Sequence, residues 1–249
     1  MKKKAVAVVM TAVMALGMVS AVSVQAGIED KTLIVGFDAE YPPYGYMDEN
    51  GEYTGFDLEL AQAVCDLEGW ELEKKPINWD SKDMELNSGS IDCIWNGFTM
   101  NGREDDYTFS EPYVDNSQVI VVADDSGIEK LTDLAGKTVG VQAASAALDL
   151  LQSEEEGGQK ELADTFGALN EFADYNTAFT ELQAGALDAL AIDVGVAKYQ
   201  LNSRGEGFKI LDETLNTEQY AIGFKKGNTE LCDIVNADLQ KLADDGTVA

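Results

Sequence analysis

The sequence predicts an α/β protein built from two similar units. Apolar, strand-like runs alternate with helical patterns along most of the chain, as is typical of this fold class. An internal repeat indicates the two units, because LNSGSIDCIWNG at 86–97 and LQAGALDALAID at 182–193 carry Leu, Gly and Asp at the same positions. The sequence has 249 residues, which is enough for two domains of ordinary size.

Each element follows from its local pattern. The apolar run TLIVGF is a strand, and two prolines in the aromatic loop after it, 38–55, prevent regular structure there. Apolar runs bounded by turn residues predict strands, and apolar residues at helical spacing predict helices. The expected strands are 32–37, 70–77, 91–95, 118–123, 138–142, the end of the repeat segment 177–193, and 220–228. The expected helices are 56–67, 79–89, 144–156, a helix running to residue 201, and 229–246, with a further helix starting just after Arg103.

The first 26 residues are predicted to be an export signal. They combine a basic MKKK start, an apolar core and a small-residue cleavage site, Val24-Gln25-Ala26, so the mature chain begins at Gly27. The apolar stretch is nearly long enough to span a bilayer, which leaves an uncleaved anchor as the alternative. No cysteine lies near residue 27, so a lipid anchor is not supported. We expect a periplasmic or extracellular protein.

Composition excludes several classes of function. Asp and Glu number 46 against 17 Lys and Arg, so nucleic acid and anionic membranes are poor partners. The sequence has no histidine, which excludes Ser-His-Asp and Cys-His nucleophiles and most zinc sites. The three cysteines, Cys65, Cys93 and Cys232, show no metal-ligand spacing and are expected to be small buried residues, with one disulfide left open. We expect neither a metal nor a cofactor.

A carboxylate-binding motif lies in DCIWNGFTMNGRED, residues 92–105. Gly97 lets the backbone approach a ligand, Thr99 adds a hydroxyl, and Arg103 offers a planar fork for a carboxylate. The alternative is a strand end and a turn, with Arg103 paired to one of the acids at 104–106.

The repeat aligns Gly97 with Asp193. In open α/β sheets ligands bind beyond the carboxyl ends of the strands, so Arg103 and Asp193 would face one ligand from two sides. A ligand that carries a carboxylate and an ammonium a few ångströms apart is an amino-acid zwitterion. The alternative for Asp193 is the N-cap of the following helix.

Side chains beyond the first two strands suit a ligand side chain. Tyr41 and Trp79 could hold it between their rings, and Asp38 could accept a hydrogen bond or charge from it. Ordinary packing of loop aromatics is the alternative, particularly for Tyr44.

The chain resembles the type II periplasmic solute-binding proteins of the polar amino-acid ABC importers, solute-binding protein family 3. The resemblance is carried by VGFDAEYPPYGYMDENGEYTGFDLELAQAV, by WD, LNSGSIDCIWNGFT and FSEPY with the intervening Arg, and by DLAGKTVGVQAASA, LQAGALDALAID and QYAIGFKKGN. It implies two Rossmann-like lobes joined by a two-strand hinge, the periplasmic binding protein-like II fold. It also implies that Arg103 and Thr99 bind the ligand carboxylate, that the Gly97 carbonyl and Asp193 bind the ammonium, and that Tyr41, Trp79 and Asp38 surround the side chain.

Three features depart from the family pattern. The usual Gly-Ser/Thr-Thr of the second-lobe carboxylate clamp is Ala144-Ser145-Ala146, where Ser145 and the helix N-terminus would still serve. The spacing from Thr99 to Arg103 is one residue shorter than the common pattern. Relatives usually continue past Ala249, so a fragment with an incompletely packed closing helix is expected.

The family topology predicts two crossings between lobes, near 114–117 and 216–220. The first lobe would comprise 27–116 plus 221–249, and the second 117–220. We expect a monomer that closes about an amino acid and docks on a membrane permease, and not an enzyme. The alternative is a prephenate or arogenate dehydratase, whose general acid could come only from Asp38, Glu40 or Asp193.

Overall fold

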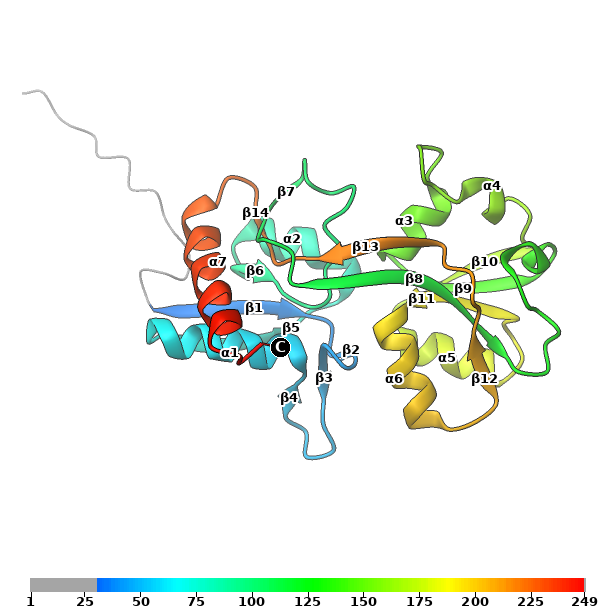
Figure 1. Cartoon of the computed structure of the whole chain (residues 1–249), viewed down its shortest axis with the longest axis horizontal. Coiled ribbons are helices and arrows are strands. Elements are labelled where there is room, and N and C mark those ends of the chain that lie inside the picture. The colour runs from blue at the N-terminus through cyan, green and yellow to red at the C-terminus, as the bar shows by residue number, and fades with distance from the viewer. Residues whose placement is uncertain (1–30, 249) are drawn as a thin grey trace, which may run out of the picture.

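The computed structural model describes residues 31–248, which form two lobes lying side by side (Figure 1). The predicted signal peptide and its cleavage site lie outside the described residues. Each lobe is built on its own mixed sheet with helices on both faces, so the predicted α/β class is confirmed. Within the described residues, no helix is long and apolar enough to cross a bilayer.

The first lobe is built on a five-stranded sheet in the order β5-β1-β6-β14-β7. The strand β1 runs parallel to β5 and β6, whereas β14 is antiparallel to β6 and β7. Helices α1 and α7 cover one face, and α2 covers the other. The bounds are β1 Thr32–Phe37, α1 Phe56–Glu68, β5 Glu71–Pro76, the short 3₁₀ turn Trp79–Ser81, α2 Lys82–Ser88, β6 Cys93–Ile94, β7 Tyr107–Phe109, β14 Gly223–Lys225 and α7 Thr229–Asp244.

The second lobe is built on a sheet in the order β10-β9-β11-β8-β12. Successive residues of β8 alternate between its faces, with Val119 and Val121 packing under α5 and α6 and Ile120 and Val122 packing under α3. The bounds are β8 Val114–Ala123, a 3₁₀ turn Leu131–Leu134, β9 Thr138–Gln142, α3 Ala146–Gln152, α4 Lys160–Ala163, β10 Ala168–Phe172, α5 Tyr175–Gln183, β11 Ala189–Asp193, α6 Val194–Arg204, β12 Phe208–Ile210 and β13 Asn216–Tyr220.

Two paired strands connect the lobes. The strand β13 pairs antiparallel with the first half of β8, from Val114 opposite Tyr220 to Gln118 opposite Asn216. The sequence analysis placed the two crossings near these segments, and the exact lobe boundaries stay a prediction. We call residues 114–118 and 216–220 the hinge strands.

The internal repeat is reproduced in the backbone. The Asp92 carboxylate accepts the Ile34 N–H at 2.8 Å, and the Asp92 N–H donates to the Ile34 carbonyl at 2.8 Å. Asp188 makes the same two bonds to Thr138, at 2.8 and 2.9 Å. In both lobes this ties the start of a strand to its parallel neighbour, so the shared Asp has a structural explanation.

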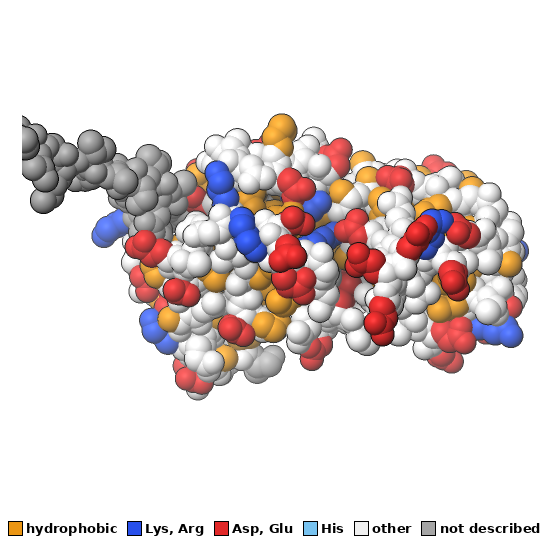
Figure 2. All heavy atoms as spheres, turned by 90° about the horizontal axis from the view of Figure 1, so that it is seen from above, with side chains coloured by type: hydrophobic (Ala, Val, Ile, Leu, Met, Phe, Trp, Pro, Cys, Tyr) orange, Lys and Arg blue, Asp and Glu red, His pale blue; other side chains and the backbone are white. Residues whose placement is uncertain are grey.

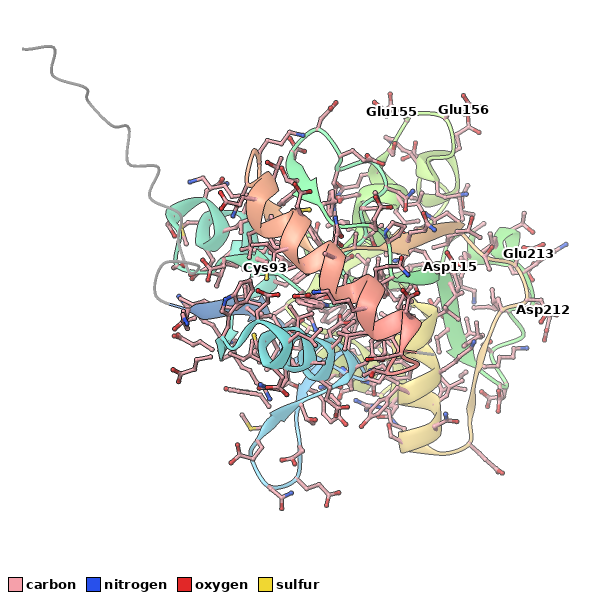
Figure 3. All side chains as sticks on the ribbon, turned by 60° about the vertical axis from the view of Figure 1, so that its left-hand side comes forward. Cys93, Asp115, Glu155, Glu156, Asp212 and Glu213 are labelled. Carbon is pink, nitrogen blue, oxygen red and sulfur yellow. The ribbon has the colours of Figure 1, made fainter. Side chains whose placement is uncertain are left out.

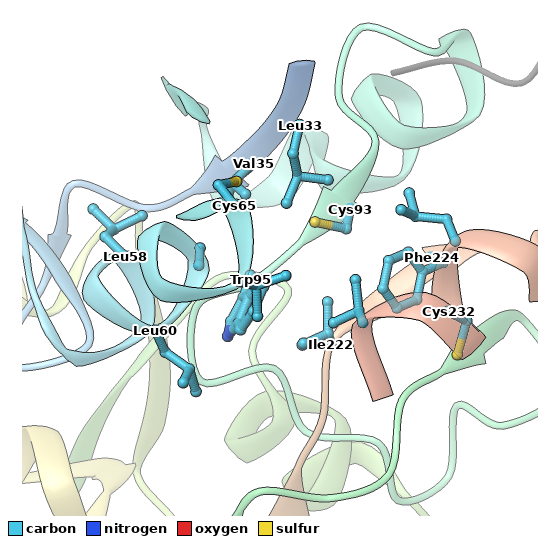
Figure 4. Packing of buried hydrophobic residues seen from close by; sticks show 14 of the residues in the cluster. Leu33, Val35, Leu58, Leu60, Cys65, Cys93, Trp95, Ile222, Phe224 and Cys232 are labelled. Atoms are coloured by element: carbon cyan, nitrogen blue, oxygen red, sulfur yellow. The ribbon is translucent and has the colours of Figure 1, made fainter. Parts of the chain in front are cut away.

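The core of the first lobe is a continuous apolar cluster between the sheet and helices α1 and α7. Figure 4 shows Cys93 and Trp95 facing Ile222 and Phe224, with Leu58 and Cys65 of α1 beside them. All three cysteines are buried and free, as expected for small apolar residues.

Several sequence expectations were wrong in detail. The loop 38–55 is not irregular, because it folds into a small sheet of β2 Glu40–Tyr41, β3 Gly45–Met47 and β4 Tyr53–Thr54. The segment after Arg103 leads into β7 and not into a helix. The helix expected over 144–156 is limited to α3, and β10, α4 and β12 were missed. These elements are short or largely exposed, so their sequences carry little hydrophobic periodicity.

Candidate functional site

A cavity of about 690 Å³ lies between the two lobes. Side chains of both lobes and of the hinge strands line it. They include Lys82, Thr99 and Arg103 of the first lobe, Ala144 and Asp149 of the second, and Glu218 of β13. The acidic loop after α3 forms part of its rim, where Figure 3 shows Glu155 and Glu156.

Arg103 spans this cavity. Its Nη2 lies 2.7 Å from Oδ2 of Asp149 on α3, its Nη1 donates to the Thr99 carbonyl at 3.3 Å, and its guanidinium lies over the Phe98 ring. The side chain is 12% exposed, against 61% for Asp149. The suggested pairing with the acids at 104–106 is therefore wrong, since the partner comes from the other lobe. The guanidinium therefore already holds a carboxylate of the protein itself.

Lys82 is a second cation in the cavity wall, and the sequence analysis missed it. It is buried, its Nζ donates to the Ala144 carbonyl at 3.2 Å, and it lies over the Trp79 ring. Burial and the neighbouring Arg103 lower its pKa. Ala144 adopts a left-handed backbone with φ 54°, so it keeps a conformation that glycine prefers. Ser145 caps α3 by accepting the Leu148 N–H at 3.2 Å.

Asp193 lies at the centre of a buried polar network. Its Oδ1 accepts hydrogen bonds from Asn116 Nδ2 at 2.8 Å, Gln118 Nε2 at 2.7 Å and the Tyr220 hydroxyl at 2.7 Å. Burial, followed by repulsion from Glu218, raises the pKa of the Asp193 carboxyl to about 6. Although Asp193 is the N-cap residue of α6, its side chain makes no capping bond, so the capping alternative does not explain it.

Thr99 joins this network to Arg103. Its hydroxyl donates to Glu218 Oε1 at 2.8 Å, while its carbonyl accepts from Arg103. Gly97 lies two residues earlier, with φ 56°, and its N–H donates to the buried Asp57 carboxylate at 2.6 Å. A β-carbon at Gly97 would lie 2.9 Å from the Tyr41 ring, so the backbone passes close to the aromatic cluster.

A second cavity, of about 660 Å³, also lies between the two lobes, and acidic side chains form much of its lining. Asp38 and Trp79 line it together with Glu40 and Asp174. Asp38 accepts the Gln142 amide at 2.7 Å across the lobes, and burial raises the pKa of its carboxyl to about 6.

The structure gathers most of the predicted site residues around the interlobe contact, but not in one chamber. Thr99 and Arg103 line the first cavity, whereas Asp38 and Trp79 line the second. Tyr41 is buried against Tyr44, Tyr175 and Tyr220, and no aromatic pair within the described residues joins it to Trp79.

The residues that sequence reasoning missed are Lys82, Asn116, Gln118, Asp149 and Glu218. Asn116 and Gln118 lie in a continuously polar run, Asp115 to Gln118, so no alternation in the sequence marks which of these side chains face the site. Lys82 and Asp149 carry no such signal either. Lys82 lies among other charged residues on α2, and Asp149 is a single acid on the short helix α3.

Comparisons with known proteins place the chain in a family. Residues 33–249 match the model of the bacterial extracellular solute-binding proteins, family 3. The L-cystine-binding protein TcyJ of Escherichia coli strain K12 is 29% identical over 95% of this chain and 90% of its own length. The arginine-binding extracellular protein ArtP of Bacillus subtilis strain 168 is 34% identical over 87% of this chain and 82% of its own.

Solved structures show the same architecture. A substrate-binding protein of an ABC uptake transporter from Streptococcus pneumoniae, with bound histidine, has a TM-score of 0.82 and 34% identity over 88% of this chain and 89% of that one. An ancestral amino-acid-binding protein described as a precursor of cyclohexadienyl dehydratase has a TM-score of 0.80 and 30% identity, over 89% and 93%. The chain belongs to the bacterial extracellular solute-binding proteins of family 3.

Proposed function

We propose that this protein binds a polar L-amino acid between its lobes and delivers it to the permease of an ABC importer. The observation that carries the proposal is the pairing of opposite charges at one interlobe site. Arg103 presents a guanidinium on one side of Thr99, and the buried acidic network of Asp193 lies on the other. A zwitterion matches this arrangement with its carboxylate on Arg103 and its ammonium on Asp193.

The ligand would hold the lobes together in the closed form. The proposed boundaries are 27–116 plus 221–249 for the first lobe and 117–220 for the second, with the hinge strands taking up the rotation. Gly97 would offer its carbonyl to the ammonium, and Ser145 and the start of α3 would approach the carboxylate from the second lobe. Because these groups come from both lobes, the ligand gains more contacts when the lobes close.

The second cavity supports a polar or cationic ligand side chain. Its lining has five acids and no Lys or Arg, and Trp79 adds a flat apolar surface. The acids are Asp38, Glu40, Asp80, Glu85 and Asp174. Tyr41 would form a wall of this region, together with Tyr175 of the second lobe, whose ring it contacts. Relatives that bind arginine and histidine are consistent with such a side chain.

We favour binding over catalysis. The named curated relatives above are binding proteins, whereas one structural neighbour is a dehydratase precursor. Asp38 and Asp193, with pKa values raised to about 6, are the groups that could act as a general acid. Turnover of prephenate or arogenate by the pure protein would establish the dehydratase alternative.

We further propose that the protein acts as a secreted monomer without cofactor, metal or nucleic acid. An export signal over residues 1–26 fits the extracellular family. The acidic surface fits a soluble protein, and Figure 2 shows acidic side chains over both lobes of the face seen from above.

The test compares ligand binding in Arg103→Ala and Asp193→Ala with the wild type by isothermal titration calorimetry. The control is Arg204→Ala, because Arg204 is the only other arginine of the sequence and pairs with Gln183 and Gln200 on the second lobe. Both site variants should lose measurable binding while the control retains it. Full binding in both site variants would overturn the proposed site.

A further inference from the structure

The hinge strands bring a second carboxylate to Asp193. Asn116 and Glu218 are cross-strand neighbours in the β8–β13 ladder, and Gln118 is opposite Asp193 in the β8–β11 ladder. The register of three strands therefore fixes both acids against the same two amides. Glu218 Oε1 accepts from Asn116 Nδ2 at 2.8 Å and from Gln118 Nε2 at 2.7 Å, which are the groups that also donate to Asp193.

This pair of acids has no cationic partner. Asp193 is 3% exposed and Glu218 is 5% exposed, and neither forms a salt bridge within the described residues. Two buried carboxylates that share their donors repel each other, and burial without a cation penalises both charges. The arrangement is therefore stabilised by a cation or by a proton.

The same cluster has an excess of hydrogen-bond acceptors. The side-chain carbonyl oxygens of Asn116 and Gln118 are buried and find no hydrogen-bond partner among residues 31–248. Glu218 Oε2 meets only Asn216 Nδ2, at 3.4 Å. A group with several N–H donors and a positive charge fits these acceptors, and an ammonium has three such donors. Glu218 lines the interlobe cavity, so a ligand in the cavity reaches the cluster.

We propose that Glu218 shares the ligand's ammonium with Asp193, and that Asp193 releases a proton when the ligand binds. This rests on the proposed function and extends it by a second ammonium-binding residue and a pH dependence. The ammonium replaces the proton on the Asp193 carboxyl, and that proton passes to the solvent, so no other reactant is needed. Binding weakens as the pH falls, because a larger fraction of the Asp193 carboxyl is then protonated and the ligand must displace that proton.

The other groups that face Asp193 do not titrate in the same range. Tyr220 on β13, Tyr41 on β2 and Tyr175 on α5 face Asp193, and burial raises the pKa of each phenol well above its usual value. These hydroxyls stay neutral throughout the relevant range. Asn116 and Gln118 on β8 do not titrate. Arg103 reaches the pair only through Thr99, and it stays charged.

Calorimetric titrations at pH 6 in two buffers of different ionisation enthalpy measure the number of protons released per ligand bound. The probes are L-arginine, L-lysine and L-glutamine, whose own groups do not titrate between pH 5 and 8. The wild type should release about half a proton per ligand at pH 6 and bind about tenfold more weakly at pH 5 than at pH 7. Glu218→Gln should release far less proton and bind about tenfold more weakly at pH 8.

The control is Glu206→Gln, because Glu206 is an exposed acid of the second lobe that makes no side-chain hydrogen bond within the described residues. It should behave as the wild type. Asp38, whose pKa is also about 6, could release a proton as well, but that release would persist in Glu218→Gln.

Carboxyl ¹³C NMR of the ligand-free protein gives a second readout that needs no ligand. The Asp193 carboxyl should titrate at a lower pH in Glu218→Gln than in the wild type. Unchanged affinity, proton release and Asp193 titration in Glu218→Gln would overturn the shared site while leaving the proposed function intact. Failure of every amino acid to bind the wild type would overturn both.

Discussion

Removing the Asp149 carboxylate should strengthen amino-acid binding. In the structure Asp149 holds the guanidinium of Arg103 at 2.7 Å, in the position proposed for the ligand carboxylate. The ligand must displace it, and the same contact holds the lobes together without a ligand. Asp149→Asn keeps the shape of the side chain and removes its charge.

The size of the effect follows from the exposure of the pair. Asp149 is 61% exposed, so the pair is worth no more than an ordinary surface ion pair, about 0.2–1 kcal/mol. The lesser exposure of Arg103, 12%, favours the upper part of that range. Since 1.4 kcal/mol corresponds to a factor of ten, the affinity should rise about twofold to fivefold.

Isothermal titration at low and high ionic strength measures this change. The gain should shrink as salt is raised, because salt screens exposed charges. The matched control is Asp164→Asn, which removes a similar ion pair, 2.6 Å to Lys160 with Asp164 64% exposed, on α4 and away from the cavity. Equal or weaker binding in Asp149→Asn, with Asp164→Asn unchanged, would refute the competition between Asp149 and the ligand.

Three further predictions concern stability. Burial raises the pKa of the Asp57 carboxyl from 3.8 to about 7, so its contribution to stability is complete below about pH 4 and is lost as the pH rises toward 7. The melting temperature should fall across that range and fall less in Asp57→Asn; a wild-type curve that rises would contradict this. Ala144→Gly should relieve the left-handed backbone at φ 54°, a gain of up to about 1 kcal/mol and about 2–4 °C in melting temperature, and a lower melting temperature would count against it. Gly36→Ala and Gly140→Ala should each lose about 1–3 kcal/mol in urea unfolding, because each new β-carbon would lie 2.4 and 2.5 Å, respectively, from a buried aliphatic side chain; one tolerated and one severe change would argue against equivalent packing in the two lobes.

The sequence predicted the strands that contain apolar runs and the unit that occurs in two copies. Strands such as β1 and β9 were found because each contains an apolar run, LIVGF and VGV, and the shared Asp92 and Asp188 identified two copies of one unit. The small sheet within 38–55 was missed because its two- and three-residue strands depend on contacts with α1 and not on their own pattern.

The candidate site was predicted only in part. Arg103 and Asp193 carry charges at the ends of strands, and that placement is visible in the sequence. Their partners are not visible, because Asp149 and Glu218 reach them only through interlobe contact and strand register. Tertiary pairing of this kind leaves no mark on local spacing.

The most direct test of the account is a calorimetric titration of the secreted form, residues 27–249, with the common L-amino acids and cystine. The account predicts that one or a few polar amino acids bind at micromolar concentration or tighter, and that a ligand lacking either the α-carboxylate or the α-ammonium does not. Absence of binding across the whole panel, from a sample shown to be folded, would contradict it.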